Sequence, residues 1–285
     1  MITRSKCCII GIPDHQGIIH IGGRLGAAKG PNAFRKAFSR LKGRFPVHEA
    51  MEDLGDVQEI TSNIEENHRN AAQLIQSGHS KTGLSIIVGG GHDHGFSHLL
   101  GIHRAIRQKS DRLKLGCINI DAHLDVRKPH PTITSGSPFY LALESGVLHP
   151  SRFIEFGIQS HCNSNELWKY LESKKVEIVR MEKLRHNRAV NTFKLKLKKL
   201  STRCDAIVVS LDLDSLACAF SPGVSAPQSE GFVSSEILEM MEIAGKEPKV
   251  ISLGIFELNP EHDRDELSAR LAATASYHFI ESSIF

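Results

Sequence analysis

The chain has 285 residues, of which 40% are hydrophobic and 24% charged, so it is long enough to bury a sizeable core. Its formal net charge of +3 is too small for a protein that gains affinity by neutralising phosphates, which argues against nucleic acid as a partner. No stretch approaches the roughly 18 apolar residues needed to span a bilayer, so we expect no membrane association and a cytoplasmic location.

Short β-branched runs alternate with amphipathic stretches along the chain. In order, runs typical of strands cover residues 6–12, 46–51, 84–89, 114–121, 152–158, 176–181, 205–212 and 249–255. The spacing of apolar residues predicts helices over 31–42, which Pro31 can open, and over 63–77. This alternation predicts an α/β protein, a mostly parallel sheet covered by helices on both faces, and a single domain over 1–285.

The most basic segment, residues 183–203, contains FKLKLKKL. Its alternation fits a strand, whereas the spacing of Phe193, Leu197 and Leu200 fits one face of a helix. We predict the helix, with its lysines on a solvated face rather than in a binding patch.

Four of the apolar runs end in ionisable residues. SIIVGGG precedes His92, LGCINI precedes Asp121, AIVVSL precedes Asp212, and VISLGIF precedes Glu257. Because the carboxyl ends of parallel strands form the crevice in which ligands bind, we expect these side chains to meet at one edge of the sheet.

Acidic and imidazole side chains also alternate after two of these strands. Asp121, His123 and Asp125 do so in NIDAHLDVR, and Asp212 and Asp214 in SLDLDSL, a spacing that turns side chains of an extended segment to one side. Crowded carboxylates raise one another's pKa unless a cation lies among them. One Asp-X-His-X-Asp motif is also compatible with a turn bearing solvated acids, but four strand ends together favour metal.

The six candidate ligands, His92 with the five residues above, are four carboxylates and two imidazoles. This set exceeds what one zinc ion normally takes and suits two hard or borderline divalent ions, for which manganese fits best. Two such ions can lower the pKa of a shared water and aim it at an electrophilic carbon.

The residues around His92 have simpler interpretations. Gly89–Gly91 lack the Lys-Ser/Thr that follows the glycines of a phosphate loop, so we expect them to permit a tight turn that brings His92 close to the acids. We interpret Asp93, His94 and His98 as helix-cap or surface residues.

Several ordered motifs resemble those of the ureohydrolases, the arginase and agmatinase superfamily. They are GGGHD, NIDAHLDVR, SLDLDSL and ELNPEHDRDELSARLAA, with GIPDHQG, GGRLGAAKGP and DLGDV nearer the amino terminus. GGGHD, DVRKPHPTITSGSPF and SPGVSAP most resemble the formimidoylglutamase branch. The resemblance implies a three-layer arginase-like α/β/α fold around a mostly parallel sheet of about eight strands, two Mn²⁺ ions per subunit, and homo-oligomers, commonly trimers or hexamers.

The resemblance also implies roles for individual residues. One ion would be held by His92, Asp121, Asp125 and Asp212, and the other by Asp121, His123, Asp212 and Asp214. Asp125 would also orient the hydroxide between them, and Glu257 would hold a cationic amidinium or guanidinium.

Where arginases and agmatinases usually carry His-Gly, this chain has Ser135-Gly136. The imidazole proposed there as a proton shuttle is therefore absent, which argues against arginase activity. Its absence is what the resemblance to the formimidoylglutamase branch implies. The implied reaction is hydrolysis of N-formimino-L-glutamate to L-glutamate and formamide.

A substrate with two carboxylates needs cationic or N–H partners. Arg127, two residues after Asp125, is the first candidate, and Ser135 is also expected to contact substrate. Arg24 and Lys29 are second choices that are as well explained by surface or structural salt bridges. The alternatives are an amidino hydrolase that releases urea from agmatine or a guanidino acid, and a non-catalytic relative that uses the scaffold for binding or assembly.

Overall fold

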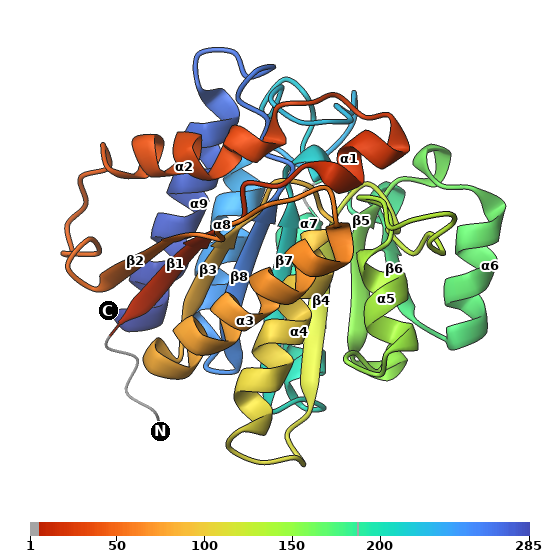
Figure 1. Ribbon diagram of the computed structural model, residues 1–285, viewed down its shortest axis with the longest axis horizontal. Coiled ribbons are helices and arrows are strands. Elements are labelled where there is room, and N and C mark those ends of the chain that lie inside the picture. Colours follow the sequence, from red (N-terminus) through yellow and green to blue (C-terminus); the bar gives the residue numbers. More distant parts are fainter. Residues whose placement is uncertain (1–5, 187) are drawn as a thin grey trace.

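Eight strands form one sheet in which every described pair is parallel (Figure 1). The computed structural model describes residues 6–186 and 188–285, so residues 1–5 of the predicted domain and Asn187 of the predicted basic helix lie outside it. The strand order is β2-β1-β3-β8-β7-β4-β5-β6. The strands are β1 Cys7–Gly11, β2 Met51–Asp56, β3 Ser85–Val88, β4 Leu115–Ile120, β5 Phe153–Ile158, β6 Glu177–Arg180, β7 Ala206–Asp212 and β8 Val250–Phe256.

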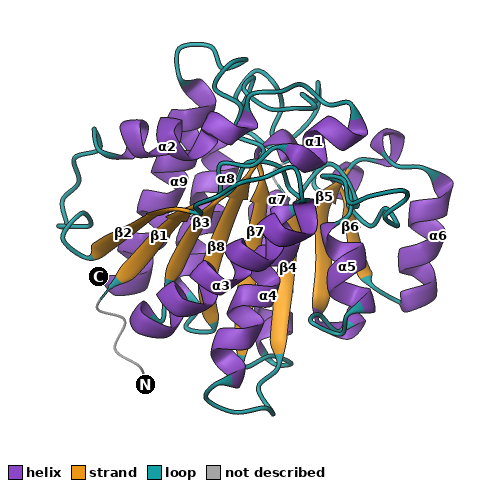
Figure 2. Cartoon of the chain, viewed as in Figure 1, coloured by secondary structure: helices purple, strands orange, loops and turns teal. Residues whose placement is uncertain are grey.

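Helices cover both faces of the sheet (Figure 2). They are α1 Gln16–Ile21, α2 Gly30–Phe38, α3 Ile64–Thr82, α4 His94–Arg107, α5 Pro138–Glu144, α6 Asn165–Lys174, α7 Ala189–Ser201, α8 Ser234–Lys246 and α9 Leu267–Ile284. One apolar cluster joins the sheet to α2, α7, α8 and α9, and a second joins it to α3, α4, α5 and α6. The predicted three-layer α/β/α architecture is confirmed.

The sequence explains why the central strands are continuous apolar runs. Every residue of β4 and β7 is buried, because helices cover both faces of a parallel sheet. The helices carry their own end signals: the Asn63 side chain accepts the Glu66 backbone N–H at the start of α3, and Gly83 ends it with a left-handed φ of 72°. None of the helices within the described parts of the chain is both long and apolar enough to span a bilayer.

Three predicted elements differ from the structure, one of them the helix expected over 63–77, which continues to Thr82. The strand expected at 46–51 lies at Met51–Asp56 instead, paired with β1 at the edge of the sheet. Its sequence MEDLGD is polar because an edge strand is partly exposed, so hydrophobicity did not mark it. The helix expected over 31–42 ends at Phe38. The basic segment forms the helix α7, as predicted, and on its surface Lys196 and Lys199 bind the Glu177 carboxylate.

Candidate metal centre

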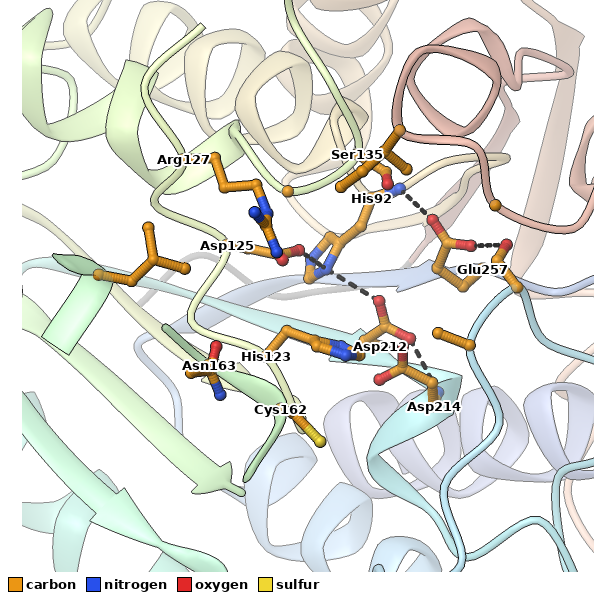
Figure 3. Close-up of a pocket in the computed structure, with 16 residues that line it drawn as sticks. His92, His123, Asp125, Arg127, Ser135, Cys162, Asn163, Asp212, Asp214 and Glu257 are labelled. Atoms are coloured by element: carbon orange, nitrogen blue, oxygen red, sulfur yellow. Dashed lines mark hydrogen bonds and ion pairs between the residues drawn. The ribbon is translucent and has the colours of Figure 1, made fainter. Parts of the chain in front are cut away.

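Four adjacent strands deliver the candidate site to one edge of the sheet. In the order β3, β8, β7, β4, their carboxyl ends carry His92, Glu257, Asp212 and Asp121. The structure therefore brings together side chains that lie up to 165 residues apart (Figure 3). This is the crevice position at which open parallel sheets bind ligands.

His92 lies at the centre of a first group of candidate ligands. Its Nδ1 is 3.1 Å from Asp121 Oδ2, 3.0 Å from Asp125 Oδ2 and 3.0 Å from Asp212 Oδ2. Its other ring nitrogen, Nε2, lies 2.9 Å from Ser210 Oγ. When Nε2 donates to Ser210, the Nδ1 lone pair faces three carboxylate oxygens, an arrangement that a cation stabilises and that neutral imidazole alone does not.

A second group shares one member with the first. His123 Nδ1 lies 3.1 Å from Asp214 Oδ2 and 3.5 Å from Asp121 Oδ1. Asp121 thus has ligand atoms in both groups, and within each group the ligand atoms lie within 4.8 Å of one another. The geometric groups place Asp212 with His92, and Asp214 Oδ1 is buried with no hydrogen-bond partner among the described residues.

Local backbone turns, rather than a fully extended chain, aim these side chains. Asp121 Oδ1 accepts the His123 backbone N–H at 2.7 Å, and Asp212 Oδ1 accepts that of Asp214 at 2.8 Å. At Asp125 the chain takes a left-handed φ of 45°. The alternating spacing therefore identified the residues, but period-two geometry does not by itself explain how they converge.

Burial of so many acids shifts their titration. It raises the pKa of Asp214 to about 6 and that of Glu257 to about 8, and it also raises the pKa of Asp125 and Asp212. Without cations these four acids are therefore harder to ionise than free carboxylates, whereas at Asp121 the hydrogen bonds with His123 and His92 outweigh burial and lower the pKa. Oxygen and imidazole donors at this density fit two divalent ions such as Mn²⁺, which would supply the missing positive charge.

The cluster opens into a cavity of about 160 Å³. Arg127, Ser135 and Glu257 line it together with five of the six candidate ligands. Arg127 and Glu257 flank the cluster on two sides in Figure 3. Arg127 is exposed, and no carboxylate among residues 6–186 and 188–285 forms an ion pair with its guanidinium. The cavity thus offers a buried acid and an unpaired cation on either side of the candidate metal centre.

A model of the arginase family matches residues 5–281 of this chain. The chain belongs to the arginase family. The match confirms the family resemblance of the sequence motifs, and it covers all eight strands.

Individual members of the arginase family extend the comparison. The formimidoylglutamase of Staphylococcus carnosus (strain TM300) is 34% identical over 272 residues, which cover 95% of this chain and 85% of the relative. Among solved structures, the formiminoglutamase of Trypanosoma cruzi with Mn²⁺ superposes with a TM-score of 0.85 at 29% identity, covering 98% of this chain and 93% of the other. The formimidoylglutamase of Bacillus subtilis gives a TM-score of 0.86 at 25% identity, with coverages of 97% and 87%.

The second-choice cations of this arginase-family protein have other partners. The Arg24 guanidinium donates to the backbone carbonyls of Pro222 and Val224, at 3.2 and 2.5 Å. Lys29 forms a surface ion pair of 2.6 Å with Glu261. Neither side chain lines the cavity, which leaves Arg127 as the candidate for a substrate carboxylate.

The interpretation of Asp93, His94 and His98 as cap or surface residues was wrong, because all three are buried. Asp93 Oδ2 lies 2.9 Å from His68 Nε2, and His94 Nε2 lies 3.0 Å from Asp14 Oδ2. Asp93 precedes α4 but makes no side-chain cap hydrogen bond. Imidazole–carboxylate hydrogen bonds pair Asp93 and His94 inside the core, and His98 Nε2 lies 2.6 Å from Ser252 Oγ; sequence alone does not reveal these partners.

The glycines before His92 allow close approach rather than an unusual φ. A Cβ on Gly90 would lie 1.7 Å from the Asp14 carbonyl oxygen, and one on Gly89 would lie 2.3 Å from Phe256. The expected turn is observed at residues 91–94, where the His94 N–H donates to the Gly91 carbonyl at 3.2 Å, but Gly89 and Gly90 are needed for close approach to Phe256 and to the Asp14 backbone.

Sequence reasoning missed Asn163, which clamps the backbone on both sides of His123. Its Oδ1 accepts the Leu124 N–H at 2.8 Å, and its Nδ2 donates to the Ala122 carbonyl at 3.0 Å and the Gln159 carbonyl at 2.9 Å. Asn163 lies after β5, outside the motifs that carry the family resemblance, and a single asparagine carries no recognisable signal.

A second missed pair lies beneath Asp121. Asn119 Nδ2 lies 3.2 Å from Asp121 Oδ2 and 3.0 Å from Glu155 Oε2, and burial raises the pKa of Glu155 well above its usual value. The available signal was a polar residue inside each of two apolar strands, LGCINI and FIEFGI.

Proposed function

We propose that this protein is a formimidoylglutamase that hydrolyses N-formimino-L-glutamate to L-glutamate and formamide with two Mn²⁺ ions per subunit. One observation carries the proposal: three aspartates and two imidazoles line a single cavity between the buried acid Glu257 and the unpaired cation Arg127, and Asp121 lies against them. The relatives described above are formimidoylglutamases, and the Trypanosoma cruzi structure contains Mn²⁺. An acid on one side of the site and a cation on the other match a substrate that has a cationic amidine at one end and carboxylates at the other.

The same residues divide into two proposed ligand sets. His92, Asp121, Asp125 and Asp212 would hold one ion, and Asp121, His123, Asp212 and Asp214 the other. The bound ions supply a nucleophile at neutral pH by lowering the pKa of water.

The remaining groups bind and orient the substrate. Glu257 accepts N–H groups of the amidinium in a charge-assisted contact that holds the formimino carbon over the candidate metal centre. Asp125, at the cavity wall, accepts a hydrogen bond from the attacking water and fixes its direction. Arg127 binds a carboxylate of the glutamate moiety through its planar guanidinium, and Ser135 lines the same side of the cavity.

A substrate panel tests the assignment. The purified protein is loaded with Mn²⁺ and assayed for formamide from N-formimino-L-glutamate and for urea from agmatine and guanidino acids. We expect formamide release that depends on Mn²⁺ and is lost in Asp125→Asn. Urea from agmatine with no turnover of formiminoglutamate would defeat the proposal, as would protein that binds manganese but turns over no amidine.

We also propose that the protein is a cytoplasmic homo-oligomer, either a trimer or a hexamer, as the family resemblance implies. Light scattering on the Mn²⁺-loaded protein measures the assembly directly, and a monomeric mass would contradict this proposal.

A further inference from the structure

Both carboxylate oxygens of Glu257 already accept hydrogen bonds from the protein. Oε1 accepts the His92 backbone N–H at 2.8 Å, and Oε2 accepts the Ser225 hydroxyl in a short contact. Glu257 itself is 3% exposed and takes a left-handed φ of 65° directly after β8. The acid proposed to hold the substrate amidine is therefore fixed in place, and its Oε2 is hydrogen-bonded to Ser225, which lines the cavity.

Ser225 is held against Glu257 by the loop that contains it. Arg24 donates to the carbonyls of Pro222 and Val224, the latter adjacent to Ser225. The Gly223 backbone N–H donates to Ser268 Oγ at 2.8 Å. Contacts from separate segments thus anchor the loop, and the anchored loop holds the Ser225 hydroxyl against Glu257.

The two amidine classes differ in the number of terminal amino groups that they can present to Glu257. The formimino carbon carries a hydrogen where a guanidino carbon carries a second terminal amino group. Two terminal amino groups form a fork of parallel N–H···O bonds that needs both oxygens of a carboxylate. At Glu257 the Ser225 hydroxyl competes for Oε2, and this competition costs a guanidinium more than it costs a formimino group.

We propose that Ser225 is a specificity-determining residue that selects formimino over guanidino substrates by occupying Glu257 Oε2. This inference rests on the proposed function, since it concerns the amidine end of that substrate.

A matched substrate pair tests it. N-formimino-L-glutamate and N-carbamimidoyl-L-glutamate differ by the replacement of the formimino C–H with an amino group, so the ratio of their kcat/KM values isolates the contact at Glu257. With Mn²⁺-loaded protein, we expect Ser225→Ala to lower the formimino-to-guanidino ratio about tenfold, the size of effect expected for one hydrogen bond to a charged group. Where guanidino turnover is too slow to follow, the inhibition constant of the carbamimidoyl compound is expected to fall by the same factor.

Three further variants make the result specific. Ser221→Ala is the matched control: Ser221 lies in the same loop, and its buried hydroxyl has no hydrogen-bond partner among the described residues, so the ratio should stay within twofold of wild type. Ser225→Thr keeps a hydroxyl and should retain the wild-type preference. Ser225→Gly repeats the measurement with the expected sign of Ser225→Ala and serves if the alanine variant is unstable.

The two proposals fail in different ways. Wild-type protein that releases no formamide from N-formimino-L-glutamate overturns the proposed function. Wild-type protein that does release it, together with Ser225→Ala and Ser225→Gly variants whose substrate ratio matches that of Ser221→Ala, overturns the role of Ser225 alone.

Discussion

Asn163 offers the sharpest test of how the fold positions its candidate metal ligands. The substitution Asn163→Asp keeps the size of the side chain and the oxygen that accepts the Leu124 N–H, but it removes the donations to Ala122 and Gln159. Both carbonyls keep another donor, because Gln159 N–H lies 3.0 Å from the Ala122 oxygen and Cys162 N–H lies 3.2 Å from the Gln159 oxygen. The cost is therefore at least that of two ordinary hydrogen bonds, about 1–3 kcal/mol in total, because the new carboxylate oxygen also faces two carbonyl oxygens that repel it.

This loss should weaken the binding of only one of the two proposed ions. Asn163 holds the residues on either side of His123, whereas His92 is held from a different strand by Ser210. A loss of about 1.4 kcal/mol is tenfold in a dissociation constant, and hydrogen-bond partners of metal ligands typically contribute about 10–100-fold. We expect Asn163→Asp to weaken the second Mn²⁺ by that factor while the first changes little.

Titration of metal-free protein with Mn²⁺, followed by calorimetry and by electron paramagnetic resonance of coupled manganese pairs, separates the two binding events. Asn165→Asp is the control, because it places the same charge at an exposed position two residues away. If Asn163→Asp and Asn165→Asp bind both ions with equal affinity, the clamp has no role in holding His123 and the reasoning is wrong.

The other predictions concern catalysis, substrate binding and pH. Asp125→Asn should lower kcat by about 10²–10⁴-fold, and a near-normal rate in steady-state assays would argue against its role at the nucleophile. Arg127→Met should raise KM for formiminoglutamate at least about tenfold with little change in kcat, whereas Lys128→Met, at the exposed neighbouring position, should leave both constants unchanged. Burial raises the pKa of Glu155 above its usual 4.5, so its stabilising contribution is present below about pH 4.5 and is lost as the pH rises toward the folded-state pKa. In metal-free protein the melting temperature of Glu155→Gln, relative to that of wild type, should therefore rise between pH 5 and pH 8. Melting temperatures that change with pH in parallel would show that ionisation of Glu155 does not destabilise the fold.

The sequence predicted the α/β architecture and seven of the strand positions because buried parallel strands are long apolar runs that stand out from their surroundings. It failed at β2, whose exposed edge position permits the polar sequence MEDLGD. The six candidate ligands were found because each stands next to an apolar strand end, so strand prediction and residue chemistry reinforced each other.

The residues that support those ligands were harder to find. Asn163, Asn119 and Ser225 act through hydrogen bonds to segments 32 to 41 residues away or to the adjacent strand end. Such contacts depend on the packing of loops rather than on local pattern. Arg24 could not be assigned from sequence for the same reason: substrate binding and a structural role explained it equally well, and its partners are two carbonyls about 200 residues away. Buried polar groups are nearly always paired, but the sequence does not identify the partner.

The strand order has a consequence for how the protein becomes active during synthesis. β8, the last strand to be made, inserts between β3 and β7 in the middle of the sheet, and only that insertion brings His92 and Glu257 beside the candidate ligands that follow β4 and β7. Because β4 and β7 pair directly, five of the six candidate ligands can meet on a nascent chain before β8 exists, whereas the group around His92 cannot form. The complete candidate metal centre therefore assembles only after the last strand has entered the sheet.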